Sequence, residues 1–244
     1  MFGIHTRLMK IYYKHLANQD ITARVIKDWN PDSNFRCRKF PEAGRLWKEW
    51  TKDNETNNCV DFSRFYSLLL NLDYVLRGGV SGALAELGVY KASSAVLLKY
   101  FADKYERDLY LYDTFEGFDT KDLHGLDKKH KKEFMDTSLD YVKNRIGQAN
   151  FRKGFFPDSI KEEDYKEKFC FVSLDCDLYA PTVSGLDFFW SRLNKGGLIF
   201  CHDYSSGYWE GCREAIDDFS RKHGTGVVLL PDVGGTAIIR KAEA

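Results

Sequence analysis

Two carboxylates stand at the end of an apolar, β-branched stretch of this sequence. Asp175 and Asp177 are one residue apart in the run FVSLDCDLY, residues 171–179. If a strand stays extended through Asp177, both side chains point to the same face of its sheet. Like charges this close raise a pKa, and a divalent cation, which prefers oxygen ligands, relieves the repulsion. The pair therefore predicts a metal site or a general base at a strand end.

A second polar cluster follows the next apolar run of the chain. His202, Asp203 and Tyr204 end the run GGLIFCHDY. If the two runs are adjacent strands of a parallel sheet, Asp203 lies beside Asp175, which gives a metal site with one carboxylate left over as a base. The alternative is that Asp177 or Asp203 only caps the helix that follows its strand.

Two earlier strand ends suit a cofactor that contains a nucleoside. Gly88, in the run ELGVY, lies where a strand turns into a helix, and a glycine there lets the backbone approach a ligand closely. Asp113 ends the next apolar run, and an acid at that position can accept hydrogen bonds from both hydroxyls of a ribose. The glycine-rich G-x-G-x-x-G turn of dinucleotide sites is missing, which disfavours a nicotinamide-dependent dehydrogenase.

These residues need strands that end at one edge of a sheet. Apolar runs predict strands within residues 82–90, 108–115, 165–179 and 196–204. Helical spacing predicts helices within residues 62–80, 92–105, 137–148, 180–194 and 211–224. Strands that alternate with helices indicate a mostly parallel sheet wound on both faces. Two apolar runs separated by the turn sequence PDVGG predict a closing antiparallel hairpin at residues 226–241.

The chain divides into an N-terminal extension and one larger domain. Residues 1–60 carry turn formers and no sustained hydrophobic period, which predicts a helical extension or a lid over the site. Residues 61–244 hold the alternating pattern and predict one α/β domain. Residues 1–16 have one apolar helical face, for which we consider docking on the domain, assembly into a homo-oligomer, or a basic membrane-surface helix.

The composition excludes several kinds of partner. Lys and Arg together number 36, as do Asp and Glu, so the neutral chain has no electrostatic footprint for nucleic acid or an anionic membrane. No stretch approaches the roughly 20 apolar residues of a membrane span, and the N-terminus lacks the apolar core of a signal peptide. The six cysteines include no C-x-x-C pair and are typical of reduced thiols in a cytoplasmic protein.

Six motifs occur in an order that resembles the macrocin O-methyltransferase family. They are AELGVYKASSA, LYLYDTFEGFD, DTSLDYV, KGFFPDS, SLDCDLYAPT and KGGLIFCHDYSSGYWEGCREAIDDF. The resemblance runs from about residue 60 to residue 240 and implies an S-adenosylmethionine-dependent enzyme that methylates sugar hydroxyls. It also implies the α/β fold of class I methyltransferases, a Rossmann-like, doubly wound sheet of seven strands with an antiparallel C-terminal hairpin.

The resemblance also implies which residues bind the cofactor. Seven residues would contact S-adenosylmethionine: Glu86, Gly88 and Tyr90 at the methionine part, Asp113, Thr114 and Phe115 at the ribose, and Ser138 near the adenine.

Family members bind Mg²⁺ through the first Asp of a D-x-D motif and an acidic pair before a Tyr. These positions are Asp175, His202 and Asp203 in this chain, and the second Asp of the motif, Asp177, would be the general base. The family usually has Asp or Glu where this chain has His202, and imidazole matches Mn²⁺, Zn²⁺ or Fe²⁺ better than Mg²⁺. We therefore expect Mg²⁺ or Mn²⁺, with His202 as a metal ligand, as a group that hydrogen-bonds the sugar, or as one that shares the base role.

We expect the chain to transfer a methyl group from S-adenosylmethionine to a sugar hydroxyl with the help of a divalent metal. The metal would lower the pKa of the hydroxyl, Asp177 would take its proton, and the alkoxide would attack the methyl in line. The acceptor is a small-molecule or glycan-end sugar, free or nucleotide-linked. The alternatives are a catechol-type small-molecule O-methyltransferase and a non-catalytic cofactor-binding or scaffold module.

Overall fold

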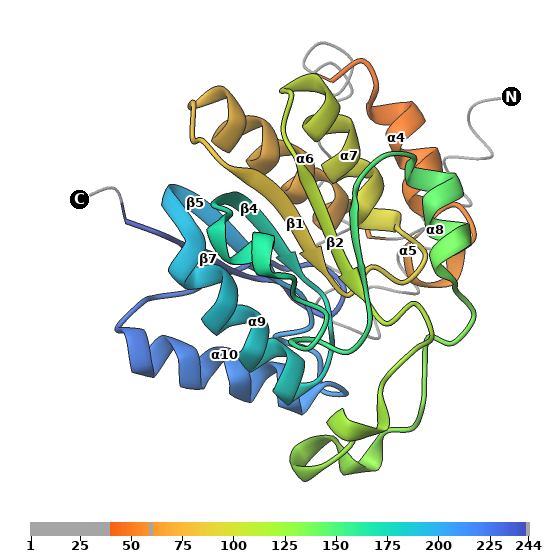
Figure 1. Cartoon of the computed structure of the whole chain (residues 1–244), viewed down its shortest axis with the longest axis vertical. Helices are drawn as coiled ribbons and strands as arrows, with labels where there is room; N and C mark the ends of the chain where they lie inside the picture. Colours follow the sequence, from red (N-terminus) through yellow and green to blue (C-terminus); the bar gives the residue numbers. More distant parts are fainter. Residues whose placement is uncertain (1–39, 59–60, 243–244) are drawn as a thin grey trace, which may run out of the picture.

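A seven-stranded sheet forms the centre of the molecule (Figure 1). The computed structural model describes residues 40–58 and 61–242. The strands are β1 (Ala83–Leu87), β2 (Leu109–Asp113), β3 (Asn150–Lys153), β4 (Phe169–Leu174), β5 (Leu193–Cys201), β6 (Val228–Leu229) and β7 (Ala237–Arg240). Their order is β3-β2-β1-β4-β5-β7-β6, with β1 to β5 parallel and β7 antiparallel to both of its neighbours. This arrangement confirms the predicted α/β fold and its closing hairpin.

Helices cover both faces of the sheet (Figure 1). They are α4 (Ala43–Thr51), the short α5 (Glu55–Asn58), α6 (Phe62–Arg77), α7 (Ser93–Lys104), α8 (Leu139–Ile146), α9 (Tyr179–Arg192) and α10 (Glu210–His223). The first large cluster of buried side chains joins the sheet to α4, α6, α7 and α8, and a second joins its other face to α9 and α10. Because both faces are covered, every residue of β1 and β4 is buried, as is usual for central parallel strands.

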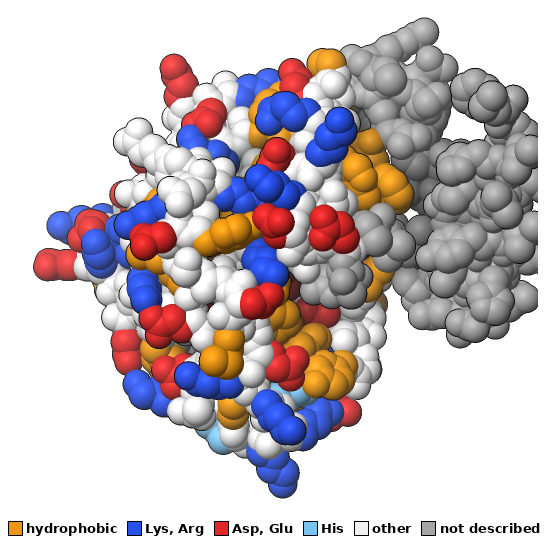
Figure 2. All heavy atoms as spheres, turned by 90° about the vertical axis from the view of Figure 1, so that its right-hand side faces the viewer, with side chains coloured by type: hydrophobic (Ala, Val, Ile, Leu, Met, Phe, Trp, Pro, Cys, Tyr) orange, Lys and Arg blue, Asp and Glu red, His pale blue; other side chains and the backbone are white. Residues whose placement is uncertain are grey.

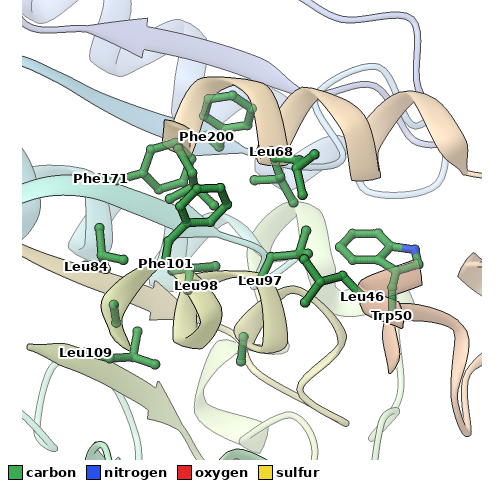
Figure 3. Close-up of a cluster of buried hydrophobic side chains, with 14 of the residues drawn as sticks. Leu46, Trp50, Leu68, Leu84, Leu97, Leu98, Phe101, Leu109, Phe171 and Phe200 are labelled. Atoms are coloured by element: carbon green, nitrogen blue, oxygen red, sulfur yellow. The ribbon is translucent and has the colours of Figure 1, made fainter. Parts of the chain in front are cut away.

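The buried core joins α4 to the sheet. Leu46 and Trp50 of α4 lie in one cluster with Phe101 of α7 and with side chains of β4 and β5 (Figure 3). Removing such large apolar side chains from water is the main favourable contribution to folding. This part of the predicted N-terminal extension is thus packed into the core, while the predictions for residues 1–39 lie outside the described residues.

The chain between β2 and α8 extends past the carboxyl ends of the strands, at the bottom of Figure 1. We call residues 116–135 the crossing segment. It contains two 3₁₀ turns, Thr120–Asp122 and Gly125–Lys129, and otherwise irregular backbone. Asp127 ties the segment to the start of α9, because its Oδ2 accepts the backbone N–H of Tyr179 at 2.7 Å.

The strands differ from the sequence prediction at two points. β4 ends at Leu174, and Asp177 has a left-handed backbone with a φ of 62°. The prediction of an extended strand through Asp177 is therefore wrong, and strand alternation does not orient its side chain. In addition, β3 has the sequence NFRK, which contains no apolar run, so hydrophobic periodicity does not predict it.

Charges of both signs are mixed on the face drawn in Figure 2, and the described cysteines are free thiols. Acidic and basic side chains are interspersed over the face drawn in Figure 2, without a large patch of either sign. No helix within residues 40–58 and 61–242 is both long and apolar enough to cross a bilayer. Four cysteines, Cys170, Cys176, Cys201 and Cys212, are free thiols, and all but Cys176 are buried.

Candidate active site

A cavity of about 500 Å³ opens at the carboxyl edge of the parallel strands. It is lined by the loops that follow β1, β2, β4 and β5, by the crossing segment, and by Trp50, Asn54 and Asn58 from the α4–α5 region. Ligands of open α/β sheets bind at this edge. The four polar strand ends identified in the sequence all contribute residues to this cavity.

Asp113 organises the cofactor side of the cavity. Its Oδ2 accepts the backbone N–H groups of Val89 and Tyr90 at 2.6 and 2.9 Å, and its Oδ1 accepts that of Phe115 at 2.5 Å. The carboxylate therefore fixes the turn between β1 and α7, and Oδ1 keeps a further lone pair for a ribose hydroxyl. Gly88, Tyr90, Asp113 and Thr114 all line the cavity, as predicted for cofactor-binding residues.

Three of the predicted cofactor residues do not line the cavity. Glu86 of β1 is fully buried, Phe115 is 1% exposed, and Ser138 caps α8 by accepting the backbone N–H of Tyr141 at 3.1 Å. Burial raises the pKa of Glu86 to about 8. Their assignment to the cofactor continues to depend on the family resemblance.

Gly88 brings the β1 turn against the end of β4. Its φ is 86°, and a Cβ at this position would collide with the backbone carbonyl of Asp175. Only glycine fits both conditions. The residue thus draws the cofactor side of the cavity towards the D-x-D carboxylates.

The structure brings Asp175, His202 and Asp203 together as the sequence predicts. His202 Nδ1 lies 3.0 Å from Asp175 Oδ1 and 2.9 Å from Asp203 Oδ2. His202 Nε2 lies 2.8 Å from the carbonyl oxygen of Val233. A carbonyl only accepts hydrogen bonds, so Nε2 carries a proton and Nδ1 faces the two carboxylates. One ligand atom from each of the three side chains lies within 4.8 Å of the others.

Arg64 is a site residue that the sequence reasoning missed. It comes from the first turn of α6, and its Nη2 lies 2.5 Å from Asp175 Oδ2. The side chain is 10% exposed, and its guanidinium lies 5.5 Å from the ring centroid of Trp50. The only signal in the sequence is a cation within the otherwise apolar run FSRFYSLLL. Because Arg64 takes Oδ2, Asp175 keeps Oδ1 for the other members of the cluster.

Comparison with protein families shows which family the chain belongs to. The model of the Macrocin-O-methyltransferase (TylF) family matches residues 48–230, which is most of the chain. The chain belongs to this family. The resemblance read from the six motifs is thereby confirmed, and the protein is an S-adenosylmethionine-dependent O-methyltransferase.

Two curated relatives of this macrocin O-methyltransferase family member are similar over much of its length. One is 8-demethyl-8-(2,3-dimethoxy-alpha-L-rhamnosyl)-tetracenomycin-C 4'-O-methyltransferase of Streptomyces olivaceus, 25% identical, with 99% of this chain and 93% of the relative covered. The other is Mycinamicin III 3''-O-methyltransferase of Micromonospora griseorubida, 28% identical, with 69% of this chain and 72% of the relative covered.

Solved structures agree with the family's fold. The O-methyltransferase NovP superposes with a TM-score of 0.64 at 20% identity over 74% of this chain and 80% of that one. The calicheamicin methyltransferase CalS11 superposes with a TM-score of 0.60 at 20% identity over 88% of this chain and 96% of that one. At these identities, the superpositions show the shared fold.

The charges of Asp175, His202 and Asp203 strongly affect one another's pKa values. Burial alone would raise the pKa of Asp175, but the Arg64 guanidinium and the His202 ring outweigh burial and hold it well below its usual range. Burial and the Arg64 charge act to lower the pKa of His202, but the Asp203 and Asp175 carboxylates outweigh them and raise it. Without a metal, His202 is thus an imidazolium that donates Nδ1–H to the carboxylates.

Asp177 completes the group of carboxylates in the cavity. It is 8% exposed, and it lines the cavity together with Asp175 and Asp203. Burial, followed by the charges of Asp203 and Asp175, raises the pKa of Asp177 well above its usual range. The four side chains therefore meet in one place, although the left-handed turn after β4 orients Asp177 instead of strand alternation.

The donor set fits a divalent metal. A histidine that ligates a metal usually donates its other N–H to a carbonyl or carboxylate, which is the arrangement of His202 Nε2 and the Val233 carbonyl. Binding would replace the Nδ1 proton, as metal binding generally does. Two carboxylates and one imidazole suit Mn²⁺, Fe²⁺ or Zn²⁺ better than Mg²⁺.

A second acidic group shares His202 but offers poorer ligands. Asp61, His202 and Asp232 also have atoms within 4.8 Å of one another. The Asp61 carboxylate caps α6, and the Asp232 carboxylate accepts the backbone N–H and the hydroxyl of Thr236, both at 2.6 Å. Both carboxylates are thus engaged in holding backbone, so the Asp175–His202–Asp203 group offers the better ligands.

Proposed function

We propose that this chain transfers a methyl group from S-adenosylmethionine to a sugar hydroxyl, with Asp177 as the general base beside a divalent metal. One observation carries the proposal: Asp177 lies with the Asp175–His202–Asp203 cluster in the same cavity as the Gly88 and Asp113 turns. The name of one curated relative supports a sugar acceptor over a catechol, since it contains a rhamnosyl group, and the names of both give O-methyl transfer.

The cofactor occupies the side of the cavity built on β1 and β2. Asp113 Oδ1 would accept a hydrogen bond from a ribose hydroxyl, with Thr114 beside it, and Gly88 and Tyr90 would contact the methionine part. The short distance between the Gly88 turn and Asp175 would place the sulfonium methyl next to the acceptor hydroxyl. Holding the two reacting atoms close and aligned supplies much of the rate of such a reaction.

Asp177 accepts the proton of the acceptor hydroxyl. A carboxylate whose pKa is raised by burial and by neighbouring carboxylates is a stronger base than an exposed one. When bound, the metal would act as a Lewis acid that lowers the pKa of the hydroxyl. His202 would serve as a ligand and not as the base, because its Nε2–H is held by the Val233 carbonyl and its Nδ1 faces Asp175 and Asp203.

The α4–α5 region would close one wall of the cavity and exclude water. Trp50, Asn54 and Asn58 line the cavity, and Trp50 is fully buried. If this wall acts as a lid over the cofactor, S-adenosylhomocysteine should slow proteolysis between residues 51 and 58. Cleavage at an unchanged rate would count against the lid.

The proposal places the enzyme in the cytoplasm. The four described cysteines are free, and three of them, Cys170, Cys176 and Cys201, lie in or beside β4 and β5. Thiols persist in the reducing cytosol.

A cofactor and acceptor assay tests the proposed function. S-adenosylhomocysteine should raise the melting temperature, and NAD should leave it unchanged. Methyl transfer to a panel of sugars should then appear with added Mn²⁺ or Mg²⁺ and disappear on exhaustive chelation. Stabilisation by NAD alone would reject the cofactor assignment, and full activity after chelation would reject the metal.

A further inference from the structure

The crossing segment gives the cavity a wall of acidic and aromatic side chains. We call this the acceptor wall; its members are Phe118, Asp119, Asp122, Glu133, Phe134 and Trp209, all of which line the cavity. Trp209 begins α10, just beyond β5, and packs against Phe118 and Phe134 with ring centroids 5.7 and 6.2 Å apart. The wall therefore lies on the side of the cavity where β5 brings in Asp203.

Asp122 is a buried carboxylate without a partner. Its exposure is 8%, and no described residue donates a hydrogen bond to its side chain, although it lines the cavity. Burial, followed by the charges of Asp119 and Asp127, raises its pKa to about 7. Because Asp122 lines the cavity and no described residue donates to its carboxylate, that carboxylate is available to accept a hydrogen bond from a ligand.

No described cation of the cavity is free to be that partner. Arg64 and His202 are held by Asp175, and Lys91 Nζ lies 2.5 Å from Asp136. These three are the cationic side chains that line the cavity within the described residues.

Lys121 follows the acceptor wall in sequence but points elsewhere. Its side chain is 63% exposed, its Nζ lies 4.7 Å from the ring centroid of Phe155, and it is 3.8 Å from Asp158. Its charge lowers the pKa of Asp122, but less than burial and the neighbouring carboxylates raise it.

We propose that the acceptor sugar carries a protonated amino group, which binds Asp122 and the aromatic faces of the acceptor wall. This inference rests on the proposed sugar O-methyl transfer and narrows its substrate class. An ammonium group next to a carboxylate forms a charge-assisted hydrogen bond, and aromatic faces attract the same charge. The acidic wall would instead repel the diphosphate of a nucleotide-linked sugar.

Binding measurements with matched sugars test this inference separately from turnover. The probes are the methyl glycosides of a 6-deoxyhexose and of its 3-amino and 4-amino analogues, titrated into the protein saturated with S-adenosylhomocysteine. The proteins are wild type, Asp122→Asn, and the control Asp158→Asn, whose side chain is 71% exposed near the same segment. An unchanged melting-temperature shift with S-adenosylhomocysteine shows that each variant is folded.

The wild type should bind one amino glycoside about tenfold more tightly than the neutral sugar, the usual worth of a charged hydrogen bond. Asp122→Asn should abolish that preference, and Asp158→Asn should keep it. Equal affinities in the wild type, or a preference that survives in Asp122→Asn, would overturn the inference. Methyl transfer without an amine preference would uphold the proposed function alone. Asp122-dependent binding without transfer to any sugar would show that Asp122 binds the amine but would reject the proposed function, and with it the bound sugar's role as acceptor.

Discussion

Asp175 is held from both sides by cations of the chain. Arg64 contacts its Oδ2 and His202 its Oδ1, and the guanidinium and the imidazolium together offset the charges of Asp175 and Asp203. In a buried site, an unbalanced carboxylate would be costly. In this arrangement three atoms can still turn to a bound metal ion: one oxygen of Asp175, Nδ1 of His202 and one oxygen of Asp203.

Replacing Arg64 should lower the stability of the folded chain and change its response to a metal ion. Arg64→Met leaves Asp175 without its main counter-charge, so we expect the free energy of unfolding to fall by about 3–5 kcal/mol, the usual cost of breaking a buried ion pair. Saturating Mn²⁺ should raise the melting temperature of the variant more than that of the wild type, because the metal supplies the missing charge. The matched control is Arg77→Met on the same helix, whose side chain is 60% exposed.

Denaturant and thermal unfolding with and without Mn²⁺ measure both effects. A loss no larger in Arg64→Met than in Arg77→Met, or an equal metal shift in variant and wild type, would contradict this account of the cluster.

The sequence predicts part of this cluster and omits part of it. Asp175, His202 and Asp203 could be found because each follows an apolar run, and parallel strands end at one edge. Arg64 could not be found in this way, because it is 111 residues from its partner and arrives on a helix. No local sequence pattern predicts which distant carboxylate a cation on a helix will contact.

The position of the crossing segment depends on Asp127, which binds the backbone at the start of α9. Its carboxylate accepts the Tyr179 N–H, and Gly211 of α10 leaves room for it, since a Cβ at Gly211 would collide with its oxygens. Asp127→Ala should therefore cost about 1–2 kcal/mol of unfolding free energy, as the loss of a helix cap does. It should also raise KM for the acceptor, because the acceptor wall belongs to the same segment.

Asp127→Asn is the matched variant, because its amide oxygen can still accept the Tyr179 N–H. We expect it to keep most of the stability and the acceptor KM. Unfolding curves and steady-state kinetics decide the matter, and an alanine variant with unchanged KM would show that the segment does not shape the acceptor site.

The central strand β1 should make stability depend on pH through Glu86. Its pKa is raised from 4.5 to about 8 in the folded chain, mainly by burial. Between these two values the folded chain holds a proton that the unfolded chain has lost, so the free energy of unfolding falls as pH rises. Above about pH 8 both states are ionised and the contribution is constant.

Glu86→Gln removes this titration while keeping the size of the side chain. Relative to the variant, the wild type should lose stability steadily from pH 5 to pH 8, by an amount of order several kcal/mol. Denaturant unfolding at intervals of one pH unit measures the difference. Parallel curves for the two proteins would show that Glu86 is not protonated in the folded state.

At the scale of elements, the apolar periods predict the long helices and the buried strands well. α7 and β1 fall within their predicted ranges because both bury regular apolar faces. β3 is missed because an edge strand with the sequence NFRK needs no apolar run. The turn after β4 is missed because a positive φ at Asp177 follows from its tertiary surroundings and leaves no mark in the local composition.

At the scale of the whole molecule, the residues proposed to bind the cofactor and the acceptor lie at one edge of the sheet. The cofactor turns of β1 and β2, the carboxylates after β4 and β5, and the acceptor wall all open into one cavity. The family match over residues 48–230 spans every one of these elements. Methyl transfer in this chain thus depends on loops at the strand ends, which the packed core on both faces of the sheet holds in place.

The central claim is that Asp177 takes the proton of the acceptor hydroxyl. Its most direct test is single-turnover transfer of a labelled methyl group to a sugar acceptor, by the wild type and by Asp177→Asn, with S-adenosylhomocysteine binding measured for both. We predict unchanged cofactor binding and a rate reduced by roughly 10²–10⁴-fold in the variant, the usual contribution of a general base. Transfer by Asp177→Asn within a few fold of the wild-type rate would contradict the account.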